Sequence, residues 1–366
     1  MTTYLLAGGG TAGHVNPLLA TADRLRGTVP DARIIVLGTA EGLEARLVPE
    51  RGYTLETIPR VPFPRRPNGA ALRFPARFAR AVADARALIR ERGVDVVVGF
   101  GGYAAMPAYV AAQRAGVPVV VHEANARPGL ANRWGARRAA AVGTVFAETR
   151  LRGAEVVGMP LRAEIERLDR AEARERAARH FGLDPERPVL LVFGGSAGAR
   201  RINDALVAAW PEVLAAGWQL LHATGGARAD EVDPAGSPDR VVVPYLDRMD
   251  LAYALADLAL CRSGSATVSE LSALGIPAVY VPYAVGNGEQ ELNARGVVAA
   301  GGARLIADRA FTPAAVSAQV IPLLADTAER ARMAAAAERC GSRDGTDRLL
   351  ALVARARAAG RSGGPR

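Results

Sequence analysis

The feature that most constrains the fold is an apolar run followed by a glycine-rich loop and a helix start, which occurs near the beginning of the chain and again near its middle. Residues 4–14 read Y-L-L-A-G-G-G-T-A-G-H, and residues 188–200 read P-V-L-L-V-F-G-G-S-A-G-A-R. Apolar runs without alternation are typical of parallel strands buried on both faces. A glycine turn between such a strand and a helix is typical of a doubly wound α/β domain. We therefore predict two Rossmann-like domains, one opening with each copy of the pattern.

After each of these two openings, predicted strands alternate with predicted helices. Apolar positions spaced by 3.6 residues predict helices over 17–26 and 72–92, and a further helix is expected over 164–180. Further strands are predicted at 33–37, 53–58, 94–98, 117–121 and 139–145 in the first half, and at 220–223, 241–244, 258–261, 278–281 and 304–306 in the second.

The length of 366 residues also suits two domains. We place their junction near residues 158–163, which gives domains over 1–160 and 161–340. The remaining segment, 341–366, is predicted to contain a helix over 347–358 and to end in the disordered tail R-S-G-G-P-R.

The composition excludes several classes of function. All 46 basic residues are arginine, so the chain has no lysine for a Schiff base, a pyridoxal-phosphate anchor or a P-loop. Cys261 and Cys340 lack metal-ligand spacing and lie far apart in the sequence, so we expect no disulfide framework, which fits a reducing cytoplasm. We find no apolar run of about 18 residues and no signal-peptide pattern, so we expect neither a membrane span nor a signal peptide.

The opening loop contains G-x-G-x-x-G at Gly8, Gly10 and Gly13, which by itself is a weak indication of dinucleotide binding. A dinucleotide site also requires an acidic residue at the end of the second strand, and Glu41 lies beyond the usual place. His14 stands where the chain enters the helix, and a plain NAD loop has no use for an imidazole there. A purely structural loop is the other alternative.

Three further loops follow predicted strands, namely G-F-G-G-Y at 99–103, H-E-A-N at 122–125 and G-G-S-A-G-A-R at 194–200. Each loop alone could be a tight turn. Because all of them lie at the carboxyl ends of predicted strands, where open α/β sheets bind ligands, together they favour an anion or diphosphate site in a cleft between two domains.

The second half adds two motifs suited to a sugar nucleotide. In C-R-S-G-S-A-T-V-S-E (261–270), Glu270 falls in the first turns of a helix and could accept both hydroxyls of a ribose, or simply stabilise the helix start. Gln290 and Asn293 lie at positions i and i+3 of the next helix, where their amides could bind sugar hydroxyls or face solvent.

Six motifs in order resemble the MurG family of peptidoglycan glycosyltransferases, in particular its actinobacterial members. They are G-G-T-A-G-H, G-F-G-G-Y, H-E-A-N-A-R-P-G-L-A-N, G-G-S-A-G-A-R, C-R-S-G-S-A-T-V-S-E and N-G-E-Q-E-L-N-A. The resemblance implies the GT-B fold, with two facing Rossmann-like domains, an interdomain cleft and a C-terminal helix that returns to the first domain. It also implies inverting transfer of N-acetylglucosamine (GlcNAc) from UDP-GlcNAc to the 4-hydroxyl of N-acetylmuramic acid (MurNAc) in lipid I, giving lipid II.

The resemblance implies roles for individual residues. Glu270 would hold the ribose, Arg162 and Ser196 would lie near the donor diphosphate, and Leu246 would lie beside the uracil. Gln290 and Asn293 would meet the GlcNAc hydroxyls. The residues implied to line the nucleotide are Ser265, Ala266, Thr267, Val268 and Ser269; those that reach the donor from the first domain are Thr11, Ala12, Gly13 and Asn125; and those on the acceptor side are His14 and Tyr103.

The chain departs from the family pattern at four positions. Ala12 replaces a frequent glycine, Ala124 and Ala197 replace frequent glutamines, and Met159 replaces a frequent asparagine. These departures bear on fine substrate choice more than on the reaction class.

An inverting transfer needs a base for the acceptor hydroxyl, and His14 is our first candidate. His122 or Glu123 could serve instead, or could orient His14. No strict D-x-D metal motif occurs in the sequence, so we expect no cofactor and no metal in the chemical step. Helix N-termini, backbone N–H groups and Arg162 would then meet the charge of the leaving group.

A basic segment suggests how the enzyme meets a lipid acceptor. Residues 60–92 contain nine arginines against Asp84 and Glu91, which indicates one basic face and argues against a protein that coats nucleic acid. An apolar strip at positions i, i+4 and i+8, rimmed by cations, suits an anionic bilayer surface, although it could instead face the protein core. The strip and its rim are Phe74, Phe78 and Val82 with Arg73, Arg77 and Arg80. We therefore expect a peripheral protein at the cytoplasmic face of the cell membrane.

Three other functions remain open from sequence alone. A tailoring glycosyltransferase of the same fold would act on a different acceptor. A nicotinamide oxidoreductase would be stabilised by NAD(P)H, and a non-enzymatic sugar-nucleotide sensor would need no base.

Overall fold

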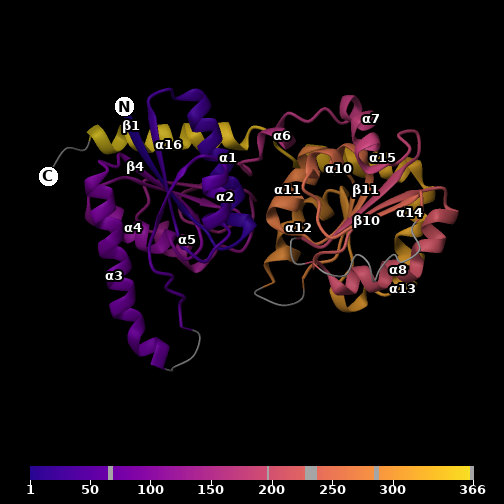
Figure 1. Cartoon of the computed structure of the whole chain (residues 1–366), viewed down its shortest axis with the longest axis horizontal. Helices are drawn as coiled ribbons and strands as arrows, with labels where there is room; N and C mark the ends of the chain where they lie inside the picture. Colours follow the sequence, from indigo (N-terminus) through magenta and orange to yellow (C-terminus); the bar gives the residue numbers. More distant parts are fainter. Residues whose placement is uncertain (65–68, 196–197, 227–236, 284–287, 363–366) are drawn as a thin grey trace. The chain divides into compact units, whose positions relative to one another are not determined.

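The chain folds into two compact units. The computed structural model describes residues 1–64, 69–195, 198–226, 237–283 and 288–362. Unit 1 comprises Met1–Arg162 and Arg343–Arg366, and unit 2 comprises Ala163–Ser342 (Figure 1). The boundaries expected from the sequence, 160 and 340, each fall two residues earlier.

Unit 1 is built on a parallel sheet of seven strands among the described residues, in the order β3-β2-β1-β4-β5-β6-β7. The strands are β1 (Thr2–Gly8), β2 (Ala32–Gly38), β3 (Thr54–Thr57), β4 (Val96–Gly101), β5 (Val119–Glu123), β6 (Ala141–Thr144) and β7 (Ala154–Val156). In register, Leu5 of β1 pairs with Ile35 of β2 on one side and with Val97 of β4 on the other. Only the short edge strand β7 was not predicted from the sequence.

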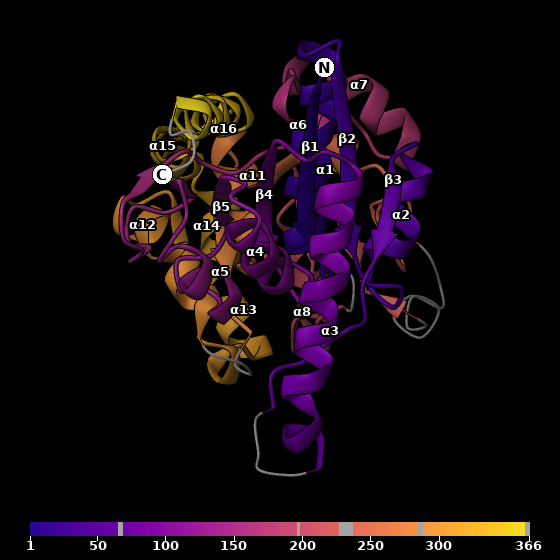
Figure 2. The same ribbon diagram turned by 90° about the vertical axis from the view of Figure 1, so that its left-hand side faces the viewer.

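Helices cover both faces of this sheet. They are α1 (Ala12–Thr28), α2 (Glu44–Glu50), α3 (Gly69–Glu91), α4 (Ala105–Arg114), α5 (Leu130–Gly135) and α16 (Gly345–Ser362). Leu5 and Ala7 of β1 pack into a core with α3 and α4, which lie next to each other in Figure 2. Tyr4 and Leu6 point to the opposite face and pack with α1 and α16. Helix α16, yellow in Figure 1, therefore belongs to unit 1 although it follows unit 2 in the sequence.

Unit 2 contains a second parallel sheet, in the order β10-β9-β8-β11-β12-β13. Its strands are β8 (Val189–Phe193), β9 (Gln219–Ala223), β10 (Arg240–Val243), β11 (Ala256–Cys261), β12 (Ala278–Tyr280) and β13 (Ala303–Leu305). Its α-helices are α6 (Ala163–Glu166), α7 (Arg170–Phe181), α8 (Arg200–Ala215), α10 (Met249–Leu255), α11 (Ser265–Ala273), α12 (Glu289–Ala299), α13 (Pro313–Gln319), α14 (Ile321–Ala325) and α15 (Thr327–Cys340). The apolar runs of β8 and β11 are buried on both faces, as their composition predicts.

The helix expected over 164–180 is in fact two helices, α6 and α7. Asp169 interrupts it, because its carboxylate accepts hydrogen bonds from the N–H groups of Ala171 and Glu172 and so caps the start of α7. A capping acid at the right spacing thus outweighed the otherwise helical composition of the segment.

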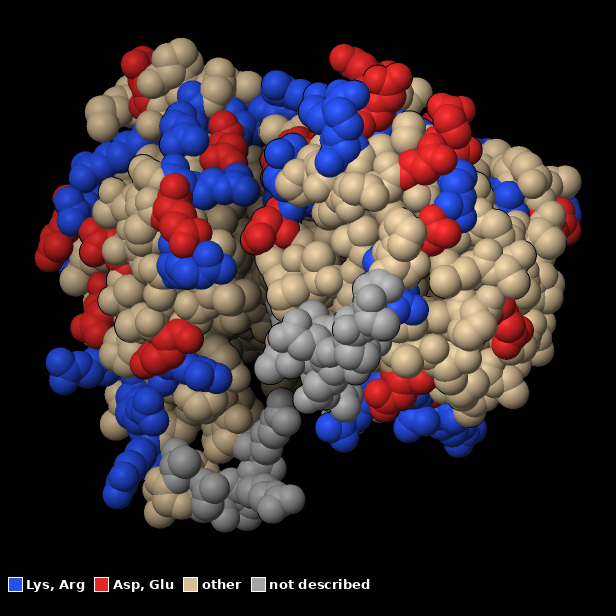
Figure 3. Space-filling view, turned by 45° about the vertical axis from the view of Figure 1, so that its right-hand side comes forward, with Lys and Arg blue, Asp and Glu red and all other residues tan. Residues whose placement is uncertain are grey.

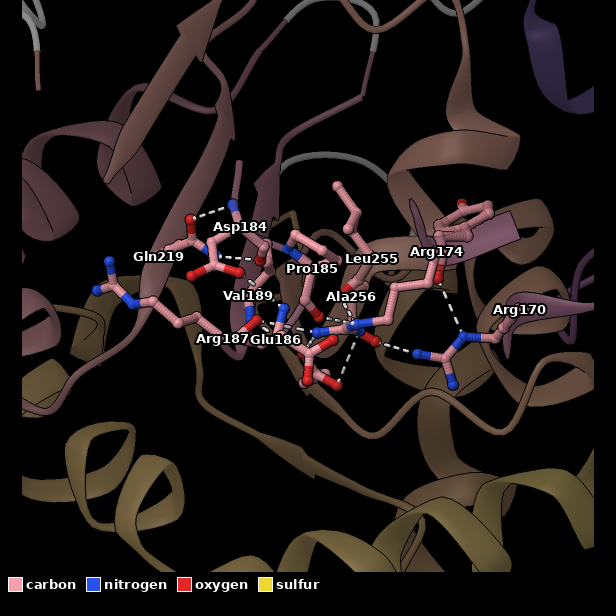
Figure 4. A network of polar contacts seen from close by, with 12 residues as sticks. Arg170, Arg174, Asp184, Pro185, Glu186, Arg187, Val189, Gln219, Leu255 and Ala256 are labelled. Carbon is pink, nitrogen blue, oxygen red and sulfur yellow. Dashed lines mark hydrogen bonds and ion pairs between the residues drawn. The ribbon is translucent and has the colours of Figure 1, made fainter. Parts of the chain in front are cut away.

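A polar network fastens α7 to the amino ends of the unit 2 strands (Figure 4). The Arg174 guanidinium donates to the carbonyls of Pro185 and Arg187 at 2.7 and 2.9 Å and pairs with the Asp257 carboxylate at 3.0 Å. Asp257 in turn accepts from the N–H of Val189, the first residue of β8, at 2.9 Å. These contacts stabilise the strand ends opposite to those that carry the predicted site loops.

Candidate active site

In unit 1, the loops after β1 and β4 meet at the carboxyl end of the sheet. The strand order reverses between these two strands, and ligands of open α/β sheets bind at such a point. A Cβ atom on Gly102 would lie 2.2 Å from the Gly9 carbonyl oxygen, and Gly102 has φ +82°. Only glycine permits this approach and this backbone conformation. The sequence motifs that contain Gly9 and Tyr103 therefore share one site.

His14 lies in this site, in the first turn of α1. Its Nδ1 is 3.2 Å from the Gly9 carbonyl oxygen and 3.3 Å from the Thr11 hydroxyl. A Cβ on Gly101 would lie 3.0 Å from the imidazole Cδ2 and Nε2 atoms, so the ring packs against the end of β4. Because a carbonyl can only accept, the bond to Gly9 forms when Nδ1 carries the proton, and Nε2 is then the basic nitrogen.

Glu44, at the start of α2, was not singled out from the sequence, yet it supports the same loop. Its side chain is 1% exposed. The carboxylate accepts from the N–H of Gly10 at 2.7 Å and from the N–H and hydroxyl of Thr39 at 2.9 and 2.8 Å. Burial by itself would raise the pKa of Glu44, but these hydrogen bonds outweigh it and hold the pKa below its ordinary value.

The two other candidate bases, His122 and Glu123, lie in the interior of unit 1. Both residues are buried, with 0% and 2% exposure, at the end of β5. The His122 Nε2 lies 3.1 Å from the Gly158 carbonyl, and burial lowers the His122 pKa to about 4. Neither side chain is accessible in this structure, which favours an orienting role for these two residues over direct action on a hydroxyl.

Glu123 instead holds the loop that follows β5. Its carboxylate accepts from the N–H groups of Asn125 and Gly129 at 2.9 and 3.0 Å and from the Asn132 amide at 3.0 Å. Burial raises the Glu123 pKa, and these donors offset part of the shift. Asn132 also accepts from the Tyr109 hydroxyl at 2.7 Å, which ties α5 to α4. Asn125 itself is partly buried beside Glu123.

The other unit 1 candidates differ in how far they are exposed. Tyr103 is 36% exposed, and the Arg60 guanidinium carbon lies 4.6 Å from the centre of its ring. Thr11 is exposed, and Ala12 and Gly13 are partly buried in the first turn of α1. Arg162 is partly buried and is the last residue of unit 1 before the chain enters unit 2. The departures Ala124 and Met159 are buried, at 1% and 3% exposure.

In unit 2, the predicted nucleotide-lining residues form the first turns of α11, after the N-cap Gly264. Ser265 and Val268 are buried, and the Ser269 hydroxyl donates to the Ser265 carbonyl at 2.8 Å. Ala266 and Thr267 are partly buried. Glu270 is 8% exposed and accepts from the Tyr253 hydroxyl at 2.8 Å, which orients its carboxylate.

The amide pair of α12 is not a solvated face. Asn293 is 1% exposed, and its amide donates to the Ser263 carbonyl at 3.3 Å, which links α12 to the loop after β11. The Gln290 side-chain oxygen accepts from the Tyr283 N–H at 2.9 Å. Leu246, after β10, is 5% exposed. Ser196 and the departure Ala197 lie outside the described residues.

The predicted membrane strip is corrected at one end. Val82 is 2% exposed and belongs to the core between α3 and the sheet, so it cannot meet a bilayer. Phe74 and Phe78 are partly buried and stack on each other, with ring centres 5.6 Å apart. Nearer the start of α3, Leu72 is 85% exposed and Phe63 is 58% exposed. A spacing of i, i+4 and i+8 describes one face of a helix, and here that face enters the core after its first turns.

Arginine rims the exposed part of the strip. Arg73, Arg77 and Arg80 are exposed on α3, and Arg77 also donates to the Arg60 carbonyl at 2.8 Å. Figure 3 shows blue side chains at the lower left of the molecule. Within the described residues, no helix is long and apolar enough to cross a membrane, and no group of three or more His, Cys, Asp or Glu side chains could hold a metal ion.

Comparison with known proteins gives the family. Residues 4–144 match the glycosyltransferase family 28 N-terminal domain, and residues 189–349 match the family 28 C-terminal domain. A relative from Leifsonia xyli subsp. xyli is 62% identical over 353 residues, covering 96% of this chain and 98% of the relative. It is named UDP-N-acetylglucosamine–N-acetylmuramyl-(pentapeptide) pyrophosphoryl-undecaprenol N-acetylglucosamine transferase.

Solved structures agree with this result. The crystal structure of Acinetobacter baumannii MurG has a TM-score of 0.80 and 27% identity, covering 97% of this chain and all of that one. The calicheamicin glycosyltransferase CalG4, at a TM-score of 0.67 and 20% identity over 99% of this chain and all of that one, shares the fold. The predicted GT-B class, two Rossmann-like domains in one chain, is thus confirmed, and the nicotinamide oxidoreductase alternative is set aside. The chain belongs to glycosyltransferase family 28 and, within it, to the UDP-N-acetylglucosamine–N-acetylmuramyl-(pentapeptide) pyrophosphoryl-undecaprenol N-acetylglucosamine transferases.

Proposed function

We propose that this protein transfers GlcNAc from UDP-GlcNAc to the 4-hydroxyl of MurNAc in lipid I and so produces lipid II for peptidoglycan synthesis. The observation that carries the proposal is 62% identity over nearly the whole chain to a relative named for this reaction. The placement of His14 where the loops after β1 and β4 meet supports it, because a proton acceptor is needed at a ligand-binding strand end.

The chemical step is a single displacement with inversion at the anomeric carbon of GlcNAc. The oxygen of the acceptor hydroxyl forms a bond to that carbon, and its proton passes to Nε2 of His14. The bond from the anomeric carbon to the diphosphate oxygen breaks, and its electron pair leaves with UDP. A base positioned in this way contributes about 10²–10⁴-fold to the rate.

The donor binds mainly to unit 2 in this proposal. Glu270, oriented by Tyr253, accepts the ribose hydroxyls, and the first turn of α11 offers backbone N–H groups to the nucleotide. Gln290 and Asn293 serve the GlcNAc hydroxyls, and Leu246 lies beside the uracil. The remaining donor contacts proposed are Arg162 and Ser196 at the diphosphate, the α11 residues Ser265 to Ser269, and Thr11, Ala12, Gly13 and Asn125 from unit 1.

The leaving diphosphate is stabilised by helix N-termini, backbone N–H groups and Arg162, with no metal in the chemical step. We expect full transfer activity in the presence of a chelator. Strict dependence on Mg²⁺ in the same assay would contradict this part of the proposal.

The protein works at the cytoplasmic face of the cell membrane, held peripherally by the beginning of α3. The exposed Leu72, together with Phe74 and Phe78, inserts among the headgroups, and Arg73, Arg77 and Arg80 attract anionic lipid at about 1 kcal/mol per well-placed cation. A Leu72→Asp/Phe74→Asp variant should lose co-sedimentation with anionic liposomes, whereas Leu130→Asp, at an exposed leucine outside α3, should not.

The proposal as a whole is tested by incubating the protein with UDP-GlcNAc and a short-chain lipid I analogue. Mass spectrometry should detect the acceptor with one added GlcNAc, together with UDP. Transfer only to a different acceptor, with none to the lipid I analogue, would favour a tailoring glycosyltransferase instead.

A further inference from the structure

The peptide group between Gly9 and Gly10 lies between two ionisable side chains. Its carbonyl, from Gly9, is 3.2 Å from Nδ1 of His14, and its N–H, from Gly10, donates to the Glu44 carboxylate at 2.7 Å. One rigid and planar unit therefore touches the imidazole at one end and a buried anion at the other. Hydrogen bonds in such a chain polarise one another, so a carboxylate on the N–H makes the carbonyl a stronger acceptor.

The surroundings of Glu44 favour the ionised carboxylate. Its hydrogen-bond donors include the N–H of Gly10 and the N–H and hydroxyl of Thr39, and each of these donates a proton to the carboxylate. Two nearby residues must be glycine to leave space for this carboxylate. A Cβ atom on Gly9 would lie 2.2 Å from Glu44 Oε1, and one on Gly42 would lie 2.0 Å from Oε2. The sequence thus provides a fitted place for one carboxylate under the loop.

His14 is in a place that otherwise disfavours the imidazolium. It lies in the first turn of the 17-residue helix α1, where the helix dipole is positive and opposes a second positive charge. A base in this place needs a compensating negative charge if it is to take up a proton during the reaction. Glu44 supplies that charge through the intervening peptide group.

We propose that Glu44 is a positioning residue that acts on His14 through the Gly9–Gly10 peptide group, holding the imidazole with its proton on Nδ1 and making Nε2 more basic. The catalytic meaning of this relay rests on the proposed function, in which Nε2 receives the hydroxyl proton. Its geometry and its effect on the imidazole do not depend on that function.

Other charged groups near the relay must be separated from Glu44 in any test. Arg60 interacts electrostatically with Glu44, Glu41 and Tyr103. The Asn132 amide lies close to Gly101 and donates to the buried carboxylate of Glu123. Glu41 is exposed in the loop before α2 and carries the same charge as Glu44, so Glu41→Gln is the matched control.

The first measurement uses the protein without substrates. The chain has only four histidines, so ¹⁵N-edited NMR can follow His14 directly, with His14→Gln assigning its signals. In the wild-type protein, we expect neutral His14 to be protonated on Nδ1. In Glu44→Gln, we expect the His14 pKa to fall by about 0.5 unit, the effect of a unit charge at short range under strong screening, whereas Glu41→Gln should leave it in place.

Either of two results would overturn the inference. One is the observation of the Nε2-protonated tautomer of His14 in the wild-type protein. This measurement does not depend on any variant being able to fold. The other is an unchanged His14 pKa in a Glu44→Gln protein whose thermal unfolding is cooperative.

The kinetic measurement separates a relay from simple support of the loop. In Glu44→Gln, the acidic limb of the pH profile of kcat/KM for the acceptor should move down by the same 0.5 unit, with KM for UDP-GlcNAc unchanged. A uniform loss of kcat at every pH would indicate structural support alone and would reject the relay. Absence of transfer by the wild-type protein would instead contradict the proposed function and leave the NMR result to decide the relay.

Discussion

In unit 1, buried carboxylates hold the N–H groups of the strand-end loops, whereas in unit 2, arginine and asparagine side chains hold the carbonyl groups of the corresponding loops. Glu44 and Glu123 accept from the loops after β1 and β5. Arg262 donates to the carbonyls of Val281 and Pro282 after β12, at 2.9 and 3.2 Å.

Asparagines extend the pattern in unit 2. Asn203 donates to the Thr224 carbonyl after β9 at 2.9 Å, and Asn293 donates to the Ser263 carbonyl after β11. The difference teaches how one fold can serve two tasks. Buried negative charge beside His14 favours proton uptake, while side-chain donors in unit 2 occupy carbonyl oxygens that would otherwise repel an anionic nucleotide.

The largest expected effect comes from removing the imidazole of unit 1. His14→Ala should lower kcat by about 10²–10⁴-fold and leave the Kd for UDP unchanged by calorimetry, because the nucleotide is proposed to bind unit 2. His180→Ala, at an exposed histidine of α7, serves as the control and should keep wild-type kcat. A large loss of UDP affinity in His14→Ala would contradict the assignment of proton uptake to unit 1 and of nucleotide binding to unit 2.

Acid should weaken both units in parallel, because each contains one buried neutral histidine. Burial lowers the pKa of His122 in unit 1 and of His222 in unit 2 to about 4, against an ordinary value of 6.5. The unfolded chain takes up these protons below pH 6.5 and the folded chain does not until about pH 4. The free energy of unfolding should therefore fall over this window, by roughly 3 kcal/mol per histidine.

Chemical denaturation at pH 7 and pH 5 measures this loss. His222→Gln can keep a hydrogen bond to Asn203, now made at 3.0 Å, without a titrating group, so its pH dependence should be shallower than that of wild type. Equal slopes for the two proteins would show that His222 does not contribute.

Removing the carbonyl donor of unit 2 should cost stability. Arg262→Met leaves the Val281 and Pro282 carbonyls without this donor and removes the ion pair to Asp308, which keeps Arg201 at 3.1 Å. Groups left unsatisfied in this way cost about 1–3 kcal/mol, which urea denaturation should detect. Arg304→Met, at a more exposed ion pair with Glu329, should cost well under 1 kcal/mol. Similar losses of unfolding free energy in the two variants would show that Arg262 stabilises unit 2 no more than an exposed arginine does.

The smallest effect is expected at the ribose contact. Glu270→Gln retains the volume but loses the charge, and should raise the Kd for UDP by about tenfold. The Kd for a pyrimidine nucleotide that lacks the ribose 2′-hydroxyl should change less. Equal changes for the two ligands would show that Glu270 supports the loop and does not bind the ribose.

Local pattern was enough to predict most strands and the loops that follow them, since buried parallel strands and glycine turns are visible in the sequence itself. The role of Glu44 was not, because it depends on β1 and β2 lying side by side so that two loops share one carboxylate. The sequence shows only a glutamate near Gly38 and Gly42, and this combination of residues is common in turns. Val82 shows the converse, because helical spacing marks an apolar face but does not say what covers it.

The attachment of α16 to unit 1 has a consequence for how the chain folds during synthesis. Leu349, Leu352 and Val353 complete one face of the unit 1 core, and a Cβ on Gly345 would lie 2.4 Å from the Met159 carbonyl. Unit 2 is continuous in sequence and can mature while the ribosome is still working. Residues 1–162 are synthesised before unit 2, but one apolar face of their core stays uncovered until α16 has left the ribosome and packs against it.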